Sequence, residues 1–165
     1  MPDITKTRKA RHLLAAAGAA VAVVGGAALA PSASADAAVA TPHATTSQLV
    51  GEQTSSGDVD LGAPGISVGD QRIVHEDLYR DGEKVGDHSS VCTFTRVSPA
   101  ALQCIGTFAL PEGQFSAQSL LHLPAPSSVD VGITGGSGAY STARGFVRTV
   151  PAGATERHFT VRLQR

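Results

Sequence analysis

The chain has 165 residues, with 13 Lys and Arg against 14 Asp and Glu, and a formal net charge of −1. Hydrophobic residues make up 42 % of the chain and charged residues 16 %. This balance gives no support to nucleic acid or an anionic membrane surface as a partner, because both require a concentration of positive charge.

The N-terminal segment is predicted to be a secretory signal peptide. Four basic residues between Lys6 and Arg11 precede an Ala-rich apolar run over 13–30, and the small-x-small pattern Ala33-Ser34-Ala35 follows. We expect cleavage after about Ala35 and export of the remaining chain, which has a net charge of −4 and no membrane anchor. A retained membrane anchor is the alternative for the apolar run.

After a flexible tail over 36–45, the rest of the chain, 46–165, is predicted to be one all-β domain. β-branched and apolar segments alternate with Gly, Pro, Asp and Ser about every ten residues, and no segment sustains a helical period. The expected strands are 46–55, 71–80, 88–97, 101–110, 113–123, 128–134, 143–150 and 156–163. Eight short strands are typical of a closed barrel or a sandwich.

Cys92 and Cys104 are predicted to form a disulfide. They flank the segment TFTRVSPAALQ, in which two β-rich arms fold back around Ser98-Pro99. Residues whose numbers sum to about 196 then face each other, and export favours closure of the pair. Two buried thiols are the alternative. The expected bridge is structural, since it has no C-x-x-C redox motif.

Alternation within the strands predicts which side chains face the interior. In the segment QFSAQSLLHL, the face that carries Phe115, Ala117 and Leu121 is the expected interior. Arg148, His158 and Arg162 alternate with apolar neighbours and are expected on the outer face, which leaves little polar chemistry inside. No metal site is predicted, because His43, His75, His88, His122 and His158 show no metal-ligand spacing.

The glycine-rich segment ITGGSGAYSTARG, residues 133–145, is predicted to be a turn between strands. A phosphate-binding loop requires Lys-Ser or Lys-Thr after its last glycine, and a dinucleotide fingerprint requires a following helix. This segment has no lysine, and the residues after it have the pattern of a strand.

The same segment carries a family resemblance. Gly135 to Gly145 resembles the Gly-Gly-Thr-Gly-x-Phe/Tyr-x-x-Ala-Arg-Gly signature of plant dirigent proteins and the similar stretch of allene oxide cyclases. The segments at 77–86, 91–97 and 113–118 follow the cyclase order at nearly the cyclase spacing. The sequence is therefore similar to secreted actinobacterial members of this superfamily over about residues 46–163.

This resemblance implies an eight-stranded antiparallel barrel with a lipocalin-like apolar cavity. It also implies a hydrophobic small molecule as partner, no metal or organic cofactor, and often a homotrimer. Fold alone does not assign a function.

The resemblance also names candidate site residues. The catalytic Glu and the Cys of the cyclases fall on Glu52 and Cys92, but their other positions are occupied by different residues, among them Glu76 and Leu121, so authentic cyclase activity is not expected. In the dirigent pattern the pocket acid falls on Glu76 or the adjacent Asp77, and the pocket arginine on Arg144. The candidate catalytic residues are thus Glu52, Glu76 and Asp77, and the expected pocket residues are Arg144, Tyr140, Leu121 and Val74.

Two alternatives remain open for these residues. An inward acid would be desolvated and able to exchange protons near neutral pH, whereas Glu76 and Asp77 at a strand end would be solvated. Arg144 either borders the pocket or pairs with a carboxylate.

Two functions follow from the two alternatives. The first is a barrel that binds a hydrophobic small molecule and steers a stereoselective cyclisation or coupling. The second is a non-catalytic secreted binding or structural module. A cavity with an inward acid would favour the first, and a barrel filled by Phe94, Phe108, Phe115 and Phe146 the second.

Overall fold

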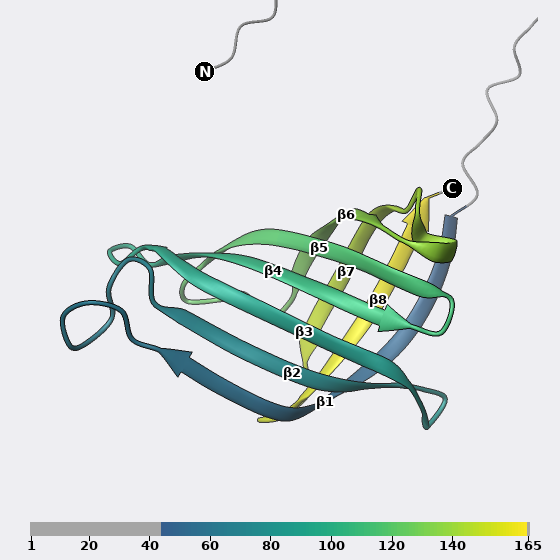
Figure 1. Ribbon diagram of the computed structural model, residues 1–165, viewed down its shortest axis with the longest axis horizontal. Coiled ribbons are helices and arrows are strands. Elements are labelled where there is room, and N and C mark those ends of the chain that lie inside the picture. Colours follow the sequence, from purple (N-terminus) through teal and green to yellow (C-terminus); the bar gives the residue numbers. More distant parts are fainter. Residues whose placement is uncertain (1–43, 165) are drawn as a thin grey trace, which may run out of the picture. The chain divides into compact units, whose positions relative to one another are not determined.

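A computed structural model describes residues 44–164 of the protein, so the predicted signal peptide and most of the predicted tail lie outside the described residues. These residues form a closed antiparallel barrel in which each strand pairs with its neighbours in the chain and β8 returns to β1 (Figure 1). The elements are β1 (Ala44–Val59), β2 (Gln71–Arg80), β3 (Glu83–Arg96), β4 (Ala101–Leu110), β5 (Gly113–His122), β6 (Val129–Gly136), the short 3₁₀ helix η1 (Gly138–Tyr140), β7 (Arg144–Pro151) and β8 (Glu156–Gln164).

The predicted eight-stranded barrel is confirmed, and β1 and β3 differ most from the expected strands, since each is several residues longer. β1 continues to Val59 because its last residues pair with the start of β2. β3 begins at Glu83, five residues early, because Asp81 and Gly82 alone make the turn after β2. Both turn residues have positive φ, 53° and 83°, as a two-residue hairpin turn requires.

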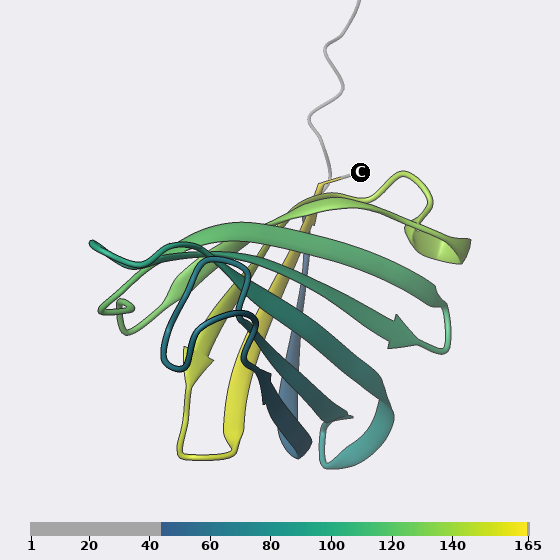
Figure 2. The ribbon, with the colours of Figure 1, turned by 60° about the vertical axis from the view of Figure 1, so that its left-hand side comes forward.

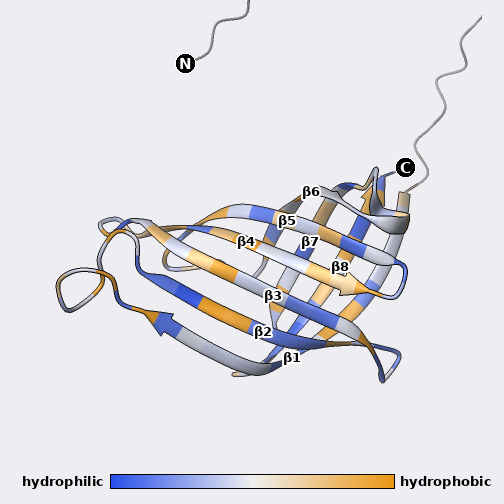
Figure 3. Cartoon of the chain, viewed as in Figure 1, coloured by the Kyte–Doolittle hydropathy of each residue, from blue (hydrophilic) through white to orange (hydrophobic). Residues whose placement is uncertain are grey.

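One half of the barrel interior is a packed aromatic and aliphatic core. The rings of Phe108 and Phe115 are stacked with centroids 4.7 Å apart, and the Phe159 ring meets Phe108 edge-on at 5.2 Å. Phe115 and Ala117 are buried, which confirms the interior face predicted for β5. Figure 3 shows the corresponding alternation of hydrophobic and hydrophilic residues along the strands.

The predicted outer-face residues Arg148, His158 and Arg162 are exposed. Arg148 forms a two-bond ion pair with Asp130 on the neighbouring strand, with both donor–acceptor distances at 2.8 Å. Within residues 44–164, no helix has the length and apolar character needed to cross a bilayer.

The glycine-rich segment is a turn between β6 and β7, as predicted. At Gly136 a side chain would bring its Cβ within 2.3 Å of the Gln114 carbonyl oxygen, so only glycine allows this close approach. The turn places Tyr140 in the core, 8 % exposed, with its ring 5.2 Å from that of Phe115.

The predicted disulfide between Cys92 and Cys104 is present. The two cysteines are directly paired residues of the β3–β4 ladder, so the pairing of these two strands brings them together.

Candidate functional site

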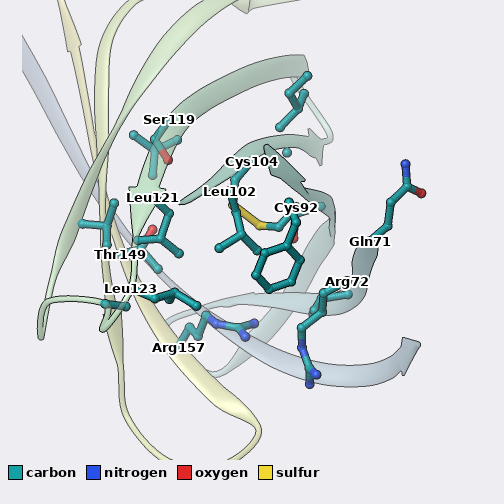
Figure 4. A pocket seen from close by; sticks show the side chains of 18 of the residues that line it. Gln71, Arg72, Cys92, Leu102, Cys104, Ser119, Leu121, Leu123, Thr149 and Arg157 are labelled. Atoms are coloured by element: carbon teal, nitrogen blue, oxygen red, sulfur yellow. A yellow bond between two sulfur atoms is a disulfide. The ribbon is translucent and has the colours of Figure 1, made fainter. Parts of the chain in front are cut away.

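A cavity of about 750 Å³ occupies the other half of the barrel interior. This volume lies in the range of small-molecule sites. Most of the wall is apolar, and Figure 4 shows side chains from several strands converging on the space, with the Cys92–Cys104 disulfide among them. The apolar lining residues include Val74, Phe94, Leu102, Phe108, Leu121, Val147 and Phe159.

The loop between β1 and β2, residues 60–70, contributes Gly65 and Ile66 to the cavity wall. Figure 2 turns the end of the barrel that carries this loop toward the viewer. The Asp70 carboxylate holds the loop together: it accepts hydrogen bonds from the Leu61 amide at 2.8 Å, the Ser67 amide at 2.7 Å and the Ser67 hydroxyl at 2.9 Å. The hydrogen bonds from the backbone amides of Leu61 and Ser67 are the main reason that the pKa of Asp70 lies below its ordinary value.

A network of three charged or titratable side chains, Glu76, His88 and Arg157, adjoins the apolar wall. Glu76 on β2 has no exposed surface. Its Oε2 accepts a hydrogen bond from Nδ1 of His88 at 2.7 Å, and its Oε1 accepts one from the Arg157 guanidinium. His88 and Arg157 both line the cavity, so they stand between the carboxylate and the space a ligand would occupy.

The barrel topology assembles this network. The β2–β3 ladder pairs Glu76 directly with His88, so their side chains emerge on the same face. Arg157 comes from the start of β8, where it pairs with Gly51 of β1. Closure of the barrel therefore brings Arg157 to Glu76 across 81 positions of sequence.

Two inward-facing glycines make room for the network. At Gly106 a Cβ would lie 2.6 Å from Nε2 of His88, and at Gly51 a Cβ would lie 2.6 Å from the Phe159 ring and 3.4 Å from the Glu76 carboxyl carbon. Larger residues at these two positions would displace the imidazole or the ring that packs beside it.

Burial by itself would raise the pKa of Glu76, but the hydrogen bond from His88 and the charge of Arg157 outweigh it. The pKa of Glu76 therefore lies below its ordinary value, and this carboxyl group is ionised near neutral pH. An ionised acceptor at Nδ1 requires that nitrogen to carry the proton.

The other ring nitrogen of His88 is available to a ligand. The His88 side chain is 9 % exposed, and its ring packs on Phe108 and Phe159 with centroids 4.2 and 5.2 Å away. Within residues 44–164, Nε2 makes no hydrogen bond, and the imidazole lines the cavity. Nε2 is thus the ring nitrogen that a ligand in the cavity can reach.

The structure places the predicted site residues in different environments. Of the three candidate acids, only Glu76 faces the interior. Glu52 and Asp77 are paired on the outer surface of the β1–β2 ladder, because their neighbours Gly51 and Glu76 take the inward positions. Glu52 is exposed, and Asp77 forms an ion pair with Lys84 at 2.8 Å.

Among the four expected pocket residues, Leu121 and Val74 line the cavity. Tyr140 instead belongs to the packed core beside Phe115. Arg144 is exposed and donates a hydrogen bond to the Ala143 carbonyl at 3.0 Å, which is a local backbone contact away from the cavity.

His88 and Arg157 were not among the predicted site residues, and they correct the expectation of little polar chemistry inside the barrel. A signal for His88 existed only in part: folding the chain at Asp81-Gly82 alone would set Asp87 opposite Glu76, and the register shift between Leu78 and Tyr79 moves His88 into that position. Arg157 had no local signal, because its partner is reached only when β8 closes on β1.

A cluster of side chains with metal-ligand atoms lies on the outer face of the barrel. Ligand atoms of His75, Asp77 and Asp87 lie within 4.8 Å of one another. The ammonium of Lys84 is 2.8 Å from Asp77 and 3.8 Å from Asp87, so a side-chain cation already occupies this position. We assign no metal to it.

Comparisons with known proteins agree with this architecture. Residues 43–163 match the family model of the allene oxide cyclase barrel like domain. No curated protein sequence matches the chain.

Solved structures provide further comparisons. A pyocyanin demethylase is 28 % identical, with a TM-score of 0.61, over 72 % of this chain and 99 % of that one. A pterocarpan synthase dirigent protein is 14 % identical, with a TM-score of 0.61, over 75 % of this chain and 89 % of that one. A Diels-Alderase from Streptomyces koyangensis is 16 % identical, with a TM-score of 0.62, over 78 % of this chain and 72 % of that one. The last two likenesses concern the fold.

Proposed function

The chain belongs to the allene oxide cyclase-like barrel family, and from the interior of its barrel we propose that it binds an apolar small molecule and catalyses proton transfer in the rearrangement of that molecule. One observation carries the proposal. Nε2 of His88 lines an apolar cavity without a partner among the described residues, while Nδ1 is held by the buried carboxylate of Glu76.

His88 is the general base in this proposal. Nε2 takes a proton from an acidic C–H or O–H of the bound molecule, and the imidazolium that forms is stabilised by the ionised Glu76. The adjacent Arg157 guanidinium stabilises the negative charge that develops on the substrate. The proton then returns to a different atom of the same molecule, so the reaction is an isomerisation or a ring closure and consumes no second reactant.

The apolar wall has two roles in such a reaction. It excludes water, which strengthens the interactions of the polar groups, and it restricts the substrate to a few conformations. We propose that this restriction makes the isomerisation or ring closure stereoselective. The same fold occurs in a Diels-Alderase and in a pterocarpan synthase dirigent protein, so ring-forming chemistry is compatible with a barrel of this kind.

The ligand that the cavity favours is aromatic. Phe94, Phe108 and Phe159 line it, and flat ring systems pack well against such walls. The 28 % identity to a pyocyanin demethylase supports the same class of ligand. Pyocyanin is therefore the first defined compound to test for binding.

The second candidate function is binding without turnover. The observation in its favour is that Glu76 and Arg157 already compensate each other's charge, as a purely structural pair would. We also propose that the protein acts after export, as its N-terminal sequence predicts.

The test begins with the protein purified from culture fluid and the molecule that co-purifies with it, identified by mass spectrometry. That molecule is then incubated in D₂O with the wild-type protein, His88→Gln and His158→Gln, the last being an exposed histidine on β8. We expect deuterium to enter the molecule with wild type and His158→Gln, and at least about 100-fold more slowly with His88→Gln. Tight binding with no deuterium incorporation by wild type would favour the binding module instead.

A further inference from the structure

We infer that the molecule bound in this cavity carries an acidic oxygen group and binds as an oxyanion, with its charge on the Arg157 guanidinium. This inference rests on the proposed function, since it names the substrate class for the same cavity. It implies a carboxylic acid, phenol or enol attached to an apolar skeleton.

Arg157 has hydrogen-bonding capacity left over. Its guanidinium gives one N–H to Glu76, and its other N–H groups make no hydrogen bond within residues 44–164. The side chain is 31 % exposed and lines the cavity, where Figure 4 shows it among the side chains that converge on this space. A guanidinium offers a fork of donors that matches an oxyanion, and such charge-assisted bonds are strong where water is scarce.

The other charged groups along the cavity are already engaged or lie in solvent. Arg72 is paired with Asp58 at 3.2 Å, and the pair is more than half exposed. The Asp70 carboxylate is held by the amides of its own loop. Asp60 is exposed in that loop. In the part of the chain that the structure describes, Arg157 is therefore the half-buried cation with donors to spare.

The placement of His88 beside Arg157 favours an acid over a permanently charged anion. Both side chains contact the same carboxylate, one at each oxygen, so both flank one region of the cavity. A ligand O–H can pass its proton to Nε2 of His88: the O–H bond breaks, an N–H bond forms, and the oxyanion remains beside Arg157. The total charge of the site is unchanged by this step.

Two fluorescent probes with the same ring skeleton test this inference: phenylnaphthylamine, which is neutral, and anilinonaphthalene sulfonate, which adds one oxyanion. We expect Arg157→Gln to weaken binding of the sulfonate probe about tenfold or more and that of the neutral probe less than about twofold. Arg162→Gln removes an exposed arginine of the same strand and should change neither. Glu76→Gln should tighten binding of the sulfonate probe alone, because Arg157 no longer shares its charge with a carboxylate.

Further variants separate the possible failures. Leu121→Trp fills the cavity and should remove both probes, which locates them. If Arg157→Gln does not fold, the double variant Glu76→Gln/Arg157→Gln removes both charges together and should show the same selective loss. Equal losses of both probes would overturn the oxyanion inference and leave the proposed function standing. Failure of both probes to bind wild type, or unchanged binding to Leu121→Trp, would overturn both.

Discussion

Glu76 and His88 are directly paired residues of neighbouring strands, and Nδ1 of His88 donates a hydrogen bond to Oε2 of Glu76 over 2.7 Å inside the barrel. Because two hydrogen-bonded strands set their separation, the orientation of the imidazole does not depend on a loop. A third side chain, Arg157 on β8, donates a hydrogen bond to the other carboxylate oxygen. Such support gives a site its shape before any ligand arrives.

Glu76→Gln should lower the free energy of unfolding by about 1–3 kcal/mol, because it removes the charge that compensates Arg157 and weakens both hydrogen bonds. Urea unfolding followed by circular dichroism measures this. Glu52→Gln, the same change at an exposed position of β1, should stay within about 0.5 kcal/mol of wild type. An equal effect at both positions would mean that the network contributes nothing to stability.

Acid should destabilise wild type more than Glu76→Gln. The pKa of Glu76 is lower in the folded protein than its ordinary value of 4.5. The unfolded chain therefore binds the proton first, and the stabilisation is present above pH 4.5 and lost as the pH falls through the folded pKa. Asp70 and Asp130 also have lowered pKa values, but wild type and Glu76→Gln both contain them, so their effect cancels in the comparison.

The difference in unfolding free energy between wild type and Glu76→Gln should thus shrink as the pH falls below about 4.5. Chemical denaturation at a series of pH values measures that difference directly. A difference independent of pH would show that the carboxyl group does not change its protonation on unfolding.

Local patterns predicted the barrel, because Gly, Pro and Asp turns separate its strands and the alternation of residues such as Phe115 and Ala117 marks the interior. Such patterns predict which residues of a hairpin lie opposite each other. They do not by themselves decide whether Glu76 or its neighbour Asp77 points into the barrel. Glu52 and Asp77 are adjacent to inward residues, so an error of one position moves each of them to the other face. Arg157 depends on the β1–β8 closure, which no hairpin pattern contains.

Gly106→Ala should displace the His88 ring, because its Cβ would lie 2.6 Å from Nε2. We expect a loss of about 1–3 kcal/mol in stability and a changed environment of the imidazole. The NMR resonances of the His88 ring measure the second effect. Gly132→Ala is the matched control, since its Cβ meets nothing closer than the Gln118 carbonyl oxygen at 3.8 Å. Unchanged His88 resonances in Gly106→Ala would contradict the steric role of this glycine.

The disulfide should stabilise the barrel by about 2–3 kcal/mol, since it closes a short loop between Cys92 and Cys104. Replacing both cysteines by alanine should lower the free energy of unfolding by that amount. Adding a reductant should bring wild type to the stability of the double variant and leave the variant itself unaffected. A variant as stable as the oxidised wild type would refute a stabilising role.

Asp70→Ala should open the loop over residues 60–70 while the barrel stays folded. The substitution leaves the amides of Leu61 and Ser67 without their acceptor. The bond from the Ser67 hydroxyl to the Leu61 carbonyl at 2.6 Å remains, but an exposed bond of this kind holds a loop less firmly than a carboxylate shared by two amides. We expect limited proteolysis to cut within 61–69 faster than in wild type, with the cleavage sites identified by mass spectrometry. Asp60→Asn changes an exposed acid of the same loop and should leave the rate unchanged.

Because Gly65 and Ile66 form part of the cavity wall, the opened loop should also weaken binding of the neutral probe. Cleavage of Asp70→Ala at the wild-type rate would mean that the carboxylate does not hold the loop.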